Sequence, residues 1–459
     1  MKKELILILA FALQPLFAIF LSSSVIAQNP RLLITTDIGG DPDDQQAVIR
    51  LMLYTNDFDM EGLIASGTHT PEAPDDDALR PELIEEIVHG YGQVHPNLLK
   101  HDESYPTPEY LLSILKKGNP HRGDRVGEDK DTEASEWIIR MVDKKDKRPL
   151  NICIFGGQVE LQQALWKVKR TRTEKDYQRF VSQIRVFDVG DQDRVFKQMF
   201  AEHPSLFYIL SKQAEGQDKR EGAYRGMYLG GDESLTSLAW LKENVLENHG
   251  PMGALYPTRT WTAPNLHGVV KEGDTPSWFF FVDNGLGCPE HPEYGSWGGR
   301  YQMTEAGYYR DATDSVGDKN IARATVYRWR GDYQSDFAAR MDWCVKDYDE
   351  ANHSPIASVN GSSVREALTI RKKPGEIIHL DASKSKDPDG DQLRYEWMVY
   401  PEAGSFNGTS MLKPDGANAS LSMPELAEGT SLHIILKVTD NREPNITAYK
   451  RIILLKDEL

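Results

Sequence analysis

The fold is decided by residues 32–44, which read LLITTDIGGDPDD. An apolar run stops there at two glycines and four aspartates. The apolar part predicts a short buried strand, and residues 47–53 predict a helix. The aspartates therefore fall in a strand-to-helix loop at the carboxyl end of a strand, where open parallel sheets usually bind ligands.

The aspartates of this loop have two compatible interpretations. Asp41 reads as a helix N-cap and Pro42 as the first helical residue, with Asp43 and Asp44 in the first turn, where the helix dipole favours acids. Capping does not explain Asp37, which stands where the strand ends. Carboxylates this close repel one another, and sharing a cation relieves the repulsion. The loop therefore predicts a metal or sugar site.

The same pattern recurs twice along the chain. Further strands are predicted at 59–66, 150–155 and 184–189, and the last two end at Gly156-Gly157 and at Gly190-Asp191-Gln192-Asp193. Helices are expected at 83–89, 109–117, 136–142, 161–168 and 235–248. Apolar strands that alternate with helices predict an α/β fold with a doubly wound, mostly parallel sheet, whose strand-end loops face one crevice.

Composition restricts the partners and the cellular location. The chain has 459 residues and a formal charge of −17, which argues against a nucleic-acid partner. Residues 1–27 combine Lys2 and Lys3 with an apolar stretch, as a signal peptide does. We expect export to the periplasm or the medium without stable membrane insertion, the alternative being an uncleaved anchor. Three cysteines provide no disulfide framework.

The character of the chain changes near residue 351. Short alternating segments at 376–380, 393–400, 431–439 and 448–454 predict a small all-β, immunoglobulin-like sandwich over 351–459, after an α/β domain over 28–350. The turn at 387–391 spaces three aspartates two apart, which suits either a small calcium loop or an ordinary Asp-rich turn. The glycine- and aromatic-rich loop at 285–301 either lines the site or packs in the core.

Several motifs together resemble one family. These are Thr35–Asp44, His249–Pro257, Lys271–Ser277, Tyr294–Arg300 and, near the C-terminus, Asp387–Asp391 with Tyr400–Gly404. The chain resembles the exported, cellulose-binding branch of the calcium-dependent nucleoside hydrolase superfamily over nearly its whole mature length. The resemblance implies a bound Ca²⁺ and a sugar-containing small molecule or glycan as the ligand.

The resemblance also implies roles for individual residues. Asp37 would bind the metal and act as general base, and Asp44 and Asp274 would be further metal ligands, with a backbone carbonyl from Gly156-Gly157. Asp43 would hold a sugar hydroxyl, and the loop with Asp191 and Asp193 would contact the sugar. Calcium takes six to eight oxygen ligands, which such carboxylates supply.

Two loops depart from that branch and leave three functions open. Gln158-Val159 replaces the Asn-Thr that the branch commonly has, and Arg194-Val195-Phe196 replaces Asp-Ser-Gly. The first hypothesis is a hydrolase of N-glycosidic or other glycosidic bonds that uses metal-activated water. The alternative is a catalytically weak or silent carbohydrate-binding protein, and a third is phosphoester hydrolysis. A leaving-group acid is not evident, since His267 is a lone histidine of a kind that is more often structural.

Overall fold

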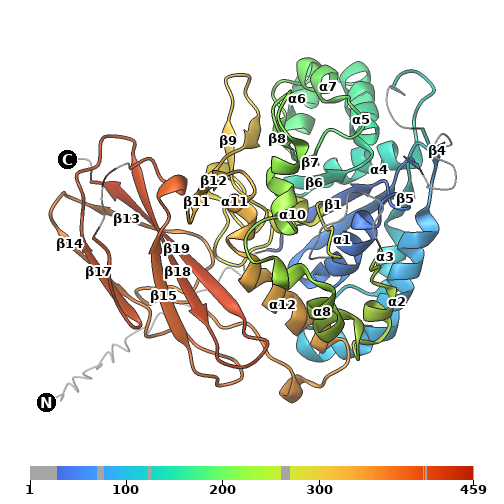
Figure 1. Ribbon diagram of the computed structural model, residues 1–459. Coiled ribbons are helices and arrows are strands. Elements are labelled where there is room, and N and C mark those ends of the chain that lie inside the picture. Colours follow the sequence, from blue (N-terminus) through green and yellow to red (C-terminus); the bar gives the residue numbers. More distant parts are fainter. Residues whose placement is uncertain are drawn as a thin grey trace, which may run out of the picture.

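The computed structural model describes residues 28–69, 77–121, 126–259, 269–406, 408 and 411–457. The predicted signal peptide, His267 and the last two residues of the chain lie outside the described residues. Figure 1 shows an α/β part followed by a separate group of strands that contains the C-terminal end of the chain. Among the described residues, no helix is both long and apolar enough to cross a bilayer.

The α/β part is built on an eight-stranded sheet in the order β5-β2-β1-β6-β7-β8-β10-β9. Its strands are β1 (Arg31–Thr36), β2 (Asp59–Ala65), β5 (Leu115–Lys117), β6 (Leu150–Phe155), β7 (Ile184–Val189), β8 (Phe207–Ser211), β9 (Tyr301–Met303) and β10 (Tyr309–Asp311). All neighbouring pairs are parallel except β9 and β10. The predicted doubly wound, mostly parallel sheet is therefore confirmed.

The strand order reverses direction at β1. The chain proceeds from β1 to β2 and β5 on one side, and then from β6 to β7 and β8 on the other. The carboxyl ends of β1 and β6 therefore flank a topological switch point, where ligands of open α/β sheets bind. This places Asp37 and Gly156, each directly after its strand, side by side at one edge of the sheet.

Helices cover both faces of the sheet. They are α1 (Asp43–Met52), α2 (Pro81–His101), α3 (Pro108–Ser113), α4 (Glu133–Val142), α5 (Gln158–Thr171), α6 (Glu174–Ser182), α7 (Phe196–Glu202), α8 (Leu238–Leu241), α9 (Gly250–Leu255), α10 (Thr275–Phe279), α11 (Ala324–Tyr327) and α12 (Arg330–Trp343). Side chains of β1 alternate between the two cores, with Leu32 and Ile34 in one and Leu33 in the other. Burial on both faces explains why this strand reads as a continuous apolar run.

Two predicted helices extend too far, whereas the helix expected at 83–89 is too short, because α2 runs from Pro81 to His101. The helix expected at 109–117 ends at Ser113, and Leu115–Lys117 instead forms the edge strand β5. The helix expected at 235–248 is α8 followed by the π-helical turn η5 (Lys242–Leu246). In the first case the tertiary pairing of β5 with β2 overrides local helical propensity.

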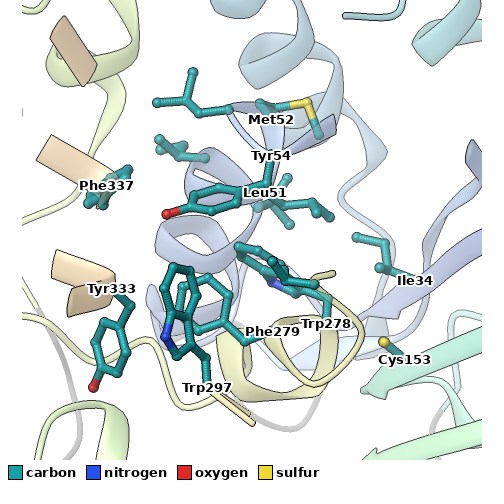
Figure 2. Packing of buried hydrophobic residues seen from close by; sticks show 14 of the residues in the cluster. Ile34, Leu51, Met52, Tyr54, Cys153, Trp278, Phe279, Trp297, Tyr333 and Phe337 are labelled. Atoms are coloured by element: carbon teal, nitrogen blue, oxygen red, sulfur yellow. The ribbon is translucent and has the colours of Figure 1, made fainter. Parts of the chain in front are cut away.

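An aromatic cluster packs between α1, α10 and α12 (Figure 2). The ring centroids of Tyr54 and Trp278 lie 5.2 Å apart, and those of Trp278 and Phe279 lie 4.6 Å apart. Trp297, from the loop at 285–301, packs on Phe279 at 5.4 Å and is 2% exposed. Core packing, and not sugar binding, is therefore the role of Trp297 in this loop.

The C-terminal strands form two packed sheets. The first has the order β13-β19-β18-β15 and the second β14-β17-β16. The bounds are β13 (Leu368–Lys372), β14 (Ile377–Asp381), β15 (Arg394–Val399), β16 (Lys413–Asp415), β17 (Asn418–Ser422), β18 (Ser431–Thr439) and β19 (Thr447–Lys456). Residues of both sheets share one hydrophobic core, as in a β-sandwich.

Strand β19 ties the sandwich to the α/β part. The Trp297 indole N–H donates to the Tyr449 hydroxyl at 3.0 Å, and Tyr449 donates to Asp332 of α12. The buried Arg451 donates to the carbonyls of Leu286 and Tyr294 at 2.7 and 3.0 Å. The loop at 285–301 is thus hydrogen-bonded to β19, the last strand of the sandwich.

Candidate functional site

The loop after β1 is shaped by its own side chains. The Thr36 hydroxyl donates to the Asp44 carboxylate and accepts the N–H of Ile38 at 3.1 Å. Helix α1 begins at Asp43, with Pro42 at the N-cap position and no side-chain cap. The predicted capping role of Asp41 is therefore wrong, whereas Asp43 and Asp44 do lie in the first turn.

Three carboxylates converge at this loop. One oxygen from each of Asp43, Asp44 and Asp274 lies within 4.8 Å of the others. Asp37 belongs to the same group, because its charge raises the pKa of all three. The structure therefore brings together four of the predicted site residues, although Asp274 is far from the others in the sequence.

Asp37 is held at the end of β6 by a close backbone approach. Its N–H donates to the Phe155 carbonyl at 3.5 Å, and the Thr35 hydroxyl donates to the Gly156 carbonyl at 2.6 Å. A Cβ at Gly156, whose φ is +122°, would lie 2.3 Å from the Asp37 Oδ1. Only glycine fits here, which explains the first glycine of the pair after β6.

Asp274 is positioned by a buried ion pair two residues before it, between Glu272 and Arg50. Glu272 accepts two hydrogen bonds from Arg50 of α1, at 2.5 and 3.0 Å, and both side chains are fully buried. Tyr256 and Thr275 also donate to Glu272. Asp274 occupies the N-cap position of α10, yet its side chain caps no N–H of that helix. Its carboxylate is therefore available to the cluster.

Burial and mutual repulsion favour protons on these carboxyls. Burial, followed by the charges of Asp41 and Asp37, raises the pKa of Asp43 to about 8. The pKa values of Asp44 and Asp274 are raised well above the ordinary value, first by burial and then by the neighbouring aspartates. Without a cation, this cluster holds negative charge at a cost in free energy.

The donor set fits a hard divalent cation. Asp274 Oδ2 is fully buried and accepts no hydrogen bond from the described residues. Such an orphaned carboxylate oxygen calls for a cation, a water molecule or a ligand as its partner. An all-oxygen set with several carboxylates suits calcium or magnesium better than zinc or copper. Asp37, Asp44 and Asp274 are the residues that would hold the ion, with Asp43 beside them.

The other two predicted substrate residues are bonded within the protein. Asp193 accepts the Val159 N–H at the start of α5 at 3.2 Å, and Asp191 accepts the Phe196 N–H at 3.0 Å and a bond from Lys212 at 2.9 Å. The structure does not place either carboxylate in the cluster of Asp43, Asp44 and Asp274. Their role in sugar binding stays a prediction.

A second set of polar side chains faces the cluster, and the sequence did not reveal it. It comes from η3 (Ala223–Met227) and from the segment before Asp274. The Lys271 ammonium lies 5.3 Å from the centre of the Tyr228 ring, and its pKa is lowered by burial against the opposing effect of Asp41 and Asp43. Arg225 lowers the pKa of Asp274, so it lies within electrostatic range of the cluster. The available signal was the Gly- and Tyr-rich run at 222–231, which follows the carboxyl end of β8.

The Asp-rich turn of the sandwich is organised by its own backbone. Asp387 accepts the N–H groups of Asp389 and Asp391 at 2.9 and 3.1 Å, as an Asx turn does. Asp389 accepts from His353, at both the backbone N–H and the ring. The three carboxylates lie close enough together to hold a cation, so the ordinary turn and the small calcium loop both stay predictions.

Comparison with known proteins places this geometry in a family. The family model described as "Cellulose-binding Sde182, nucleoside hydrolase-like domain" matches residues 31–301. The chain belongs to this family. The model described as "Cellulose-binding protein Sde0182, C-terminal domain" matches residues 377–455, within the sandwich. A search of curated proteins gave no match.

A solved structure is similar over almost the full chain. It is a nucleoside hydrolase-related hypothetical protein from Saccharophagus degradans, described as associated with carbohydrate metabolism. The two sequences are 32% identical, the TM-score is 0.78, and the match covers 94% of this chain and 100% of that one. The nucleoside-hydrolase-like scaffold and the family's two-part organisation are therefore shared features.

Proposed function

We propose that this protein is an exported, calcium-dependent hydrolase of N-glycosidic or other glycosidic bonds. The observation that carries the proposal is the convergence of Asp43, Asp44 and Asp274 within 4.8 Å at the switch point of the sheet, beside Asp37. The nucleoside-hydrolase-like scaffold supports the proposal.

Each carboxylate has a task in this reaction. Bound calcium would supply a fixed positive charge that orients sugar hydroxyls and acidifies a water molecule. Asp37, fixed against Gly156, would accept the proton of that water. Asp43, at the first turn of α1, would accept a hydrogen bond from a sugar hydroxyl. The remaining negative charge would stabilise the positive charge that develops on the sugar as the glycosidic bond loosens.

Calcium titration of the mature chain tests the site. We expect calorimetric binding by the unsubstituted protein and its loss in Asp44→Asn and Asp274→Asn, with Asp318→Asn, at an exposed turn, as the matched control. Calcium-loaded protein is then assayed with nucleosides and nitrophenyl glycosides, with and without EGTA. Absence of calcium binding in the unsubstituted protein would refute the proposal.

A second candidate is a carbohydrate-binding protein without turnover. Two observations favour it: the family is described as cellulose-binding, and Asp191 and Asp193 are engaged in the protein's own hydrogen bonds. A pure binder would show no turnover and would retain its glycan affinity after Asp37→Asn. A hydrolase would show turnover that Asp37→Asn abolishes while the affinity is kept. Cellulose pull-down and glycoside hydrolysis, measured on the same variant, separate the two functions.

A further inference from the structure

A group of hydrogen-bond donors lies beside the carboxylates, within electrostatic range of Asp274 and Asp43. Arg225 Nε donates to the Tyr224 hydroxyl at 3.0 Å, and Arg225 Nη1 donates to the Tyr228 hydroxyl. We call Tyr224, Arg225, Tyr228 and Lys271 the donor wall. It faces aspartates that only accept hydrogen bonds when ionised. The site therefore has an acceptor side and a donor side.

The donor wall is fixed in position relative to Asp274. The Tyr224 ring lies against Gly273, where a Cβ would be 3.1 Å from its Cδ2. Asp311 accepts the Ala223 N–H at 3.0 Å and also bonds from Ser211 and Gln213 at 3.0 and 3.1 Å, which anchors η3 to the ends of β8 and β10. A guanidinium held this way is preorganised for a ligand.

Arg225 is bracketed by neutral groups. Within the part of the chain that the structure describes, Arg225 donates to two phenol hydroxyls and makes no ion pair. Most other partly buried arginines near the sheet have carboxylate partners, as Arg323 has Glu221 and Arg340 has Asp57. Among the described residues, no contacting carboxylate therefore offsets the desolvation of Arg225.

We infer that the donor wall binds a carboxylate on the sugar ligand, so that the preferred substrate class is a uronic acid or its glycoside. This inference rests on the proposed sugar-binding function of the aspartate cluster. A guanidinium has five N–H donors. The bonds to Tyr224 and Tyr228 use the N–H of Nε and one N–H of Nη1, so an edge made of the second Nη1 N–H and an Nη2 N–H remains. One such edge matches the two oxygens of a carboxylate. The aspartates and their cation would then hold the ring hydroxyls at the opposite end.

Calcium-loaded protein is titrated with D-glucuronate and with D-glucose, which differ only at the carboxylate. Calorimetry is used, with saturation-transfer NMR for millimolar affinities. We expect glucuronate to bind roughly tenfold to a hundredfold more tightly. Arg225→Gln removes this preference but keeps the calcium response of the protein. Arg220→Gln, an exposed arginine before η3, keeps both.

The outcomes separate this inference from the proposed function. Absence of calcium binding by the unsubstituted protein would refute the proposed function. If the protein binds calcium but binds glucuronate and glucose equally, or does not bind glucuronate, only the assignment of the donor wall is refuted. Tighter binding of glucose 6-phosphate than of glucuronate would assign the wall to phosphate and overturn the carboxylate.

Discussion

Asp43→Asn is expected to stabilise the calcium-free protein. At pH 7.5 Asp43 is mostly protonated in the folded state, where its pKa is about 8, and ionised in the unfolded chain, where its pKa is 3.8; this difference costs the folded state up to about 5 kcal/mol. Partial exposure of the side chain reduces this to about 2 kcal/mol. Asparagine retains an oxygen for the Asp44 N–H, which donates to Asp43 at 3.1 Å. The variant should therefore unfold at higher urea concentration in EGTA.

Calcium should reverse the order of the two proteins. A cation that binds only the folded state adds about 2.7 kcal/mol at one hundred times its Kd, and the variant, with one carboxylate fewer, gains less. Because Asp43 has a raised folded pKa, the charge costs nothing below about pH 4 and costs most above pH 8. The advantage of the variant in EGTA therefore shrinks as the pH falls.

Urea unfolding followed by tryptophan fluorescence, with and without calcium, measures both effects. Asp318→Asn, at an exposed turn, serves as the control and should change neither. Destabilisation by Asp43→Asn in EGTA would refute the repulsion argument. Equal stabilisation with and without calcium would show that the cluster does not take up the cation.

Three further substitutions test the supports of the site. Burial raises the pKa of Glu160 from 4.5 to about 7. The free energy of unfolding therefore falls as the pH rises from about 4.5 through 7. Glu160→Gln should remove about 3 kcal/mol of this fall between pH 4.5 and 8. Glu272→Gln leaves the buried Arg50 uncompensated and should cost about 3–5 kcal/mol in urea unfolding. Gly156→Ala drives a Cβ against Asp37 and should abolish calcium-induced thermal stabilisation.

Matched variants isolate the causes. Glu160 variants are compared in EGTA, and an unchanged pH slope would contradict the assignment. The double variant Arg50→Met/Glu272→Leu should lose much less stability than Glu272→Gln, and equal losses would contradict the role of the buried charge. Gly190→Ala, at φ +85° with open space around its Cβ, reports the backbone cost alone. Loss of the calcium response in that variant too would remove the steric explanation.

The sequence predicted the parts of the fold whose pattern is local. Strands β1, β6 and β7 are buried on both faces, so they read as apolar runs. Strand β5 could not be read in this way, because its strand conformation depends on pairing with β2. Local propensity at 109–117 favoured a helix, and a non-local hydrogen-bond ladder decided otherwise.

The acidic half of the candidate site was predictable, but the donor half was not. The motif around Asp37 and the family resemblance led to Asp274, which the fold brings to Asp43 and Asp44. Arg225 lies in a short 3₁₀ segment with no hydrophobic period and no metal-ligand spacing. Its position depends on the bonds of Asp311 to the start of that segment, which no one-dimensional pattern contains.

The bonds from β19 to the loop at 285–301 affect how the chain can be made. During synthesis the α/β sheet can assemble before the sandwich exists, but the loop's partners Tyr449 and Arg451 emerge more than a hundred residues later. Until β19 has been made, the loop at 285–301 lacks these hydrogen-bond partners. A chain interrupted before β19 would lose a strand of the sandwich and also the hydrogen bonds that hold the loop at 285–301 of the α/β part.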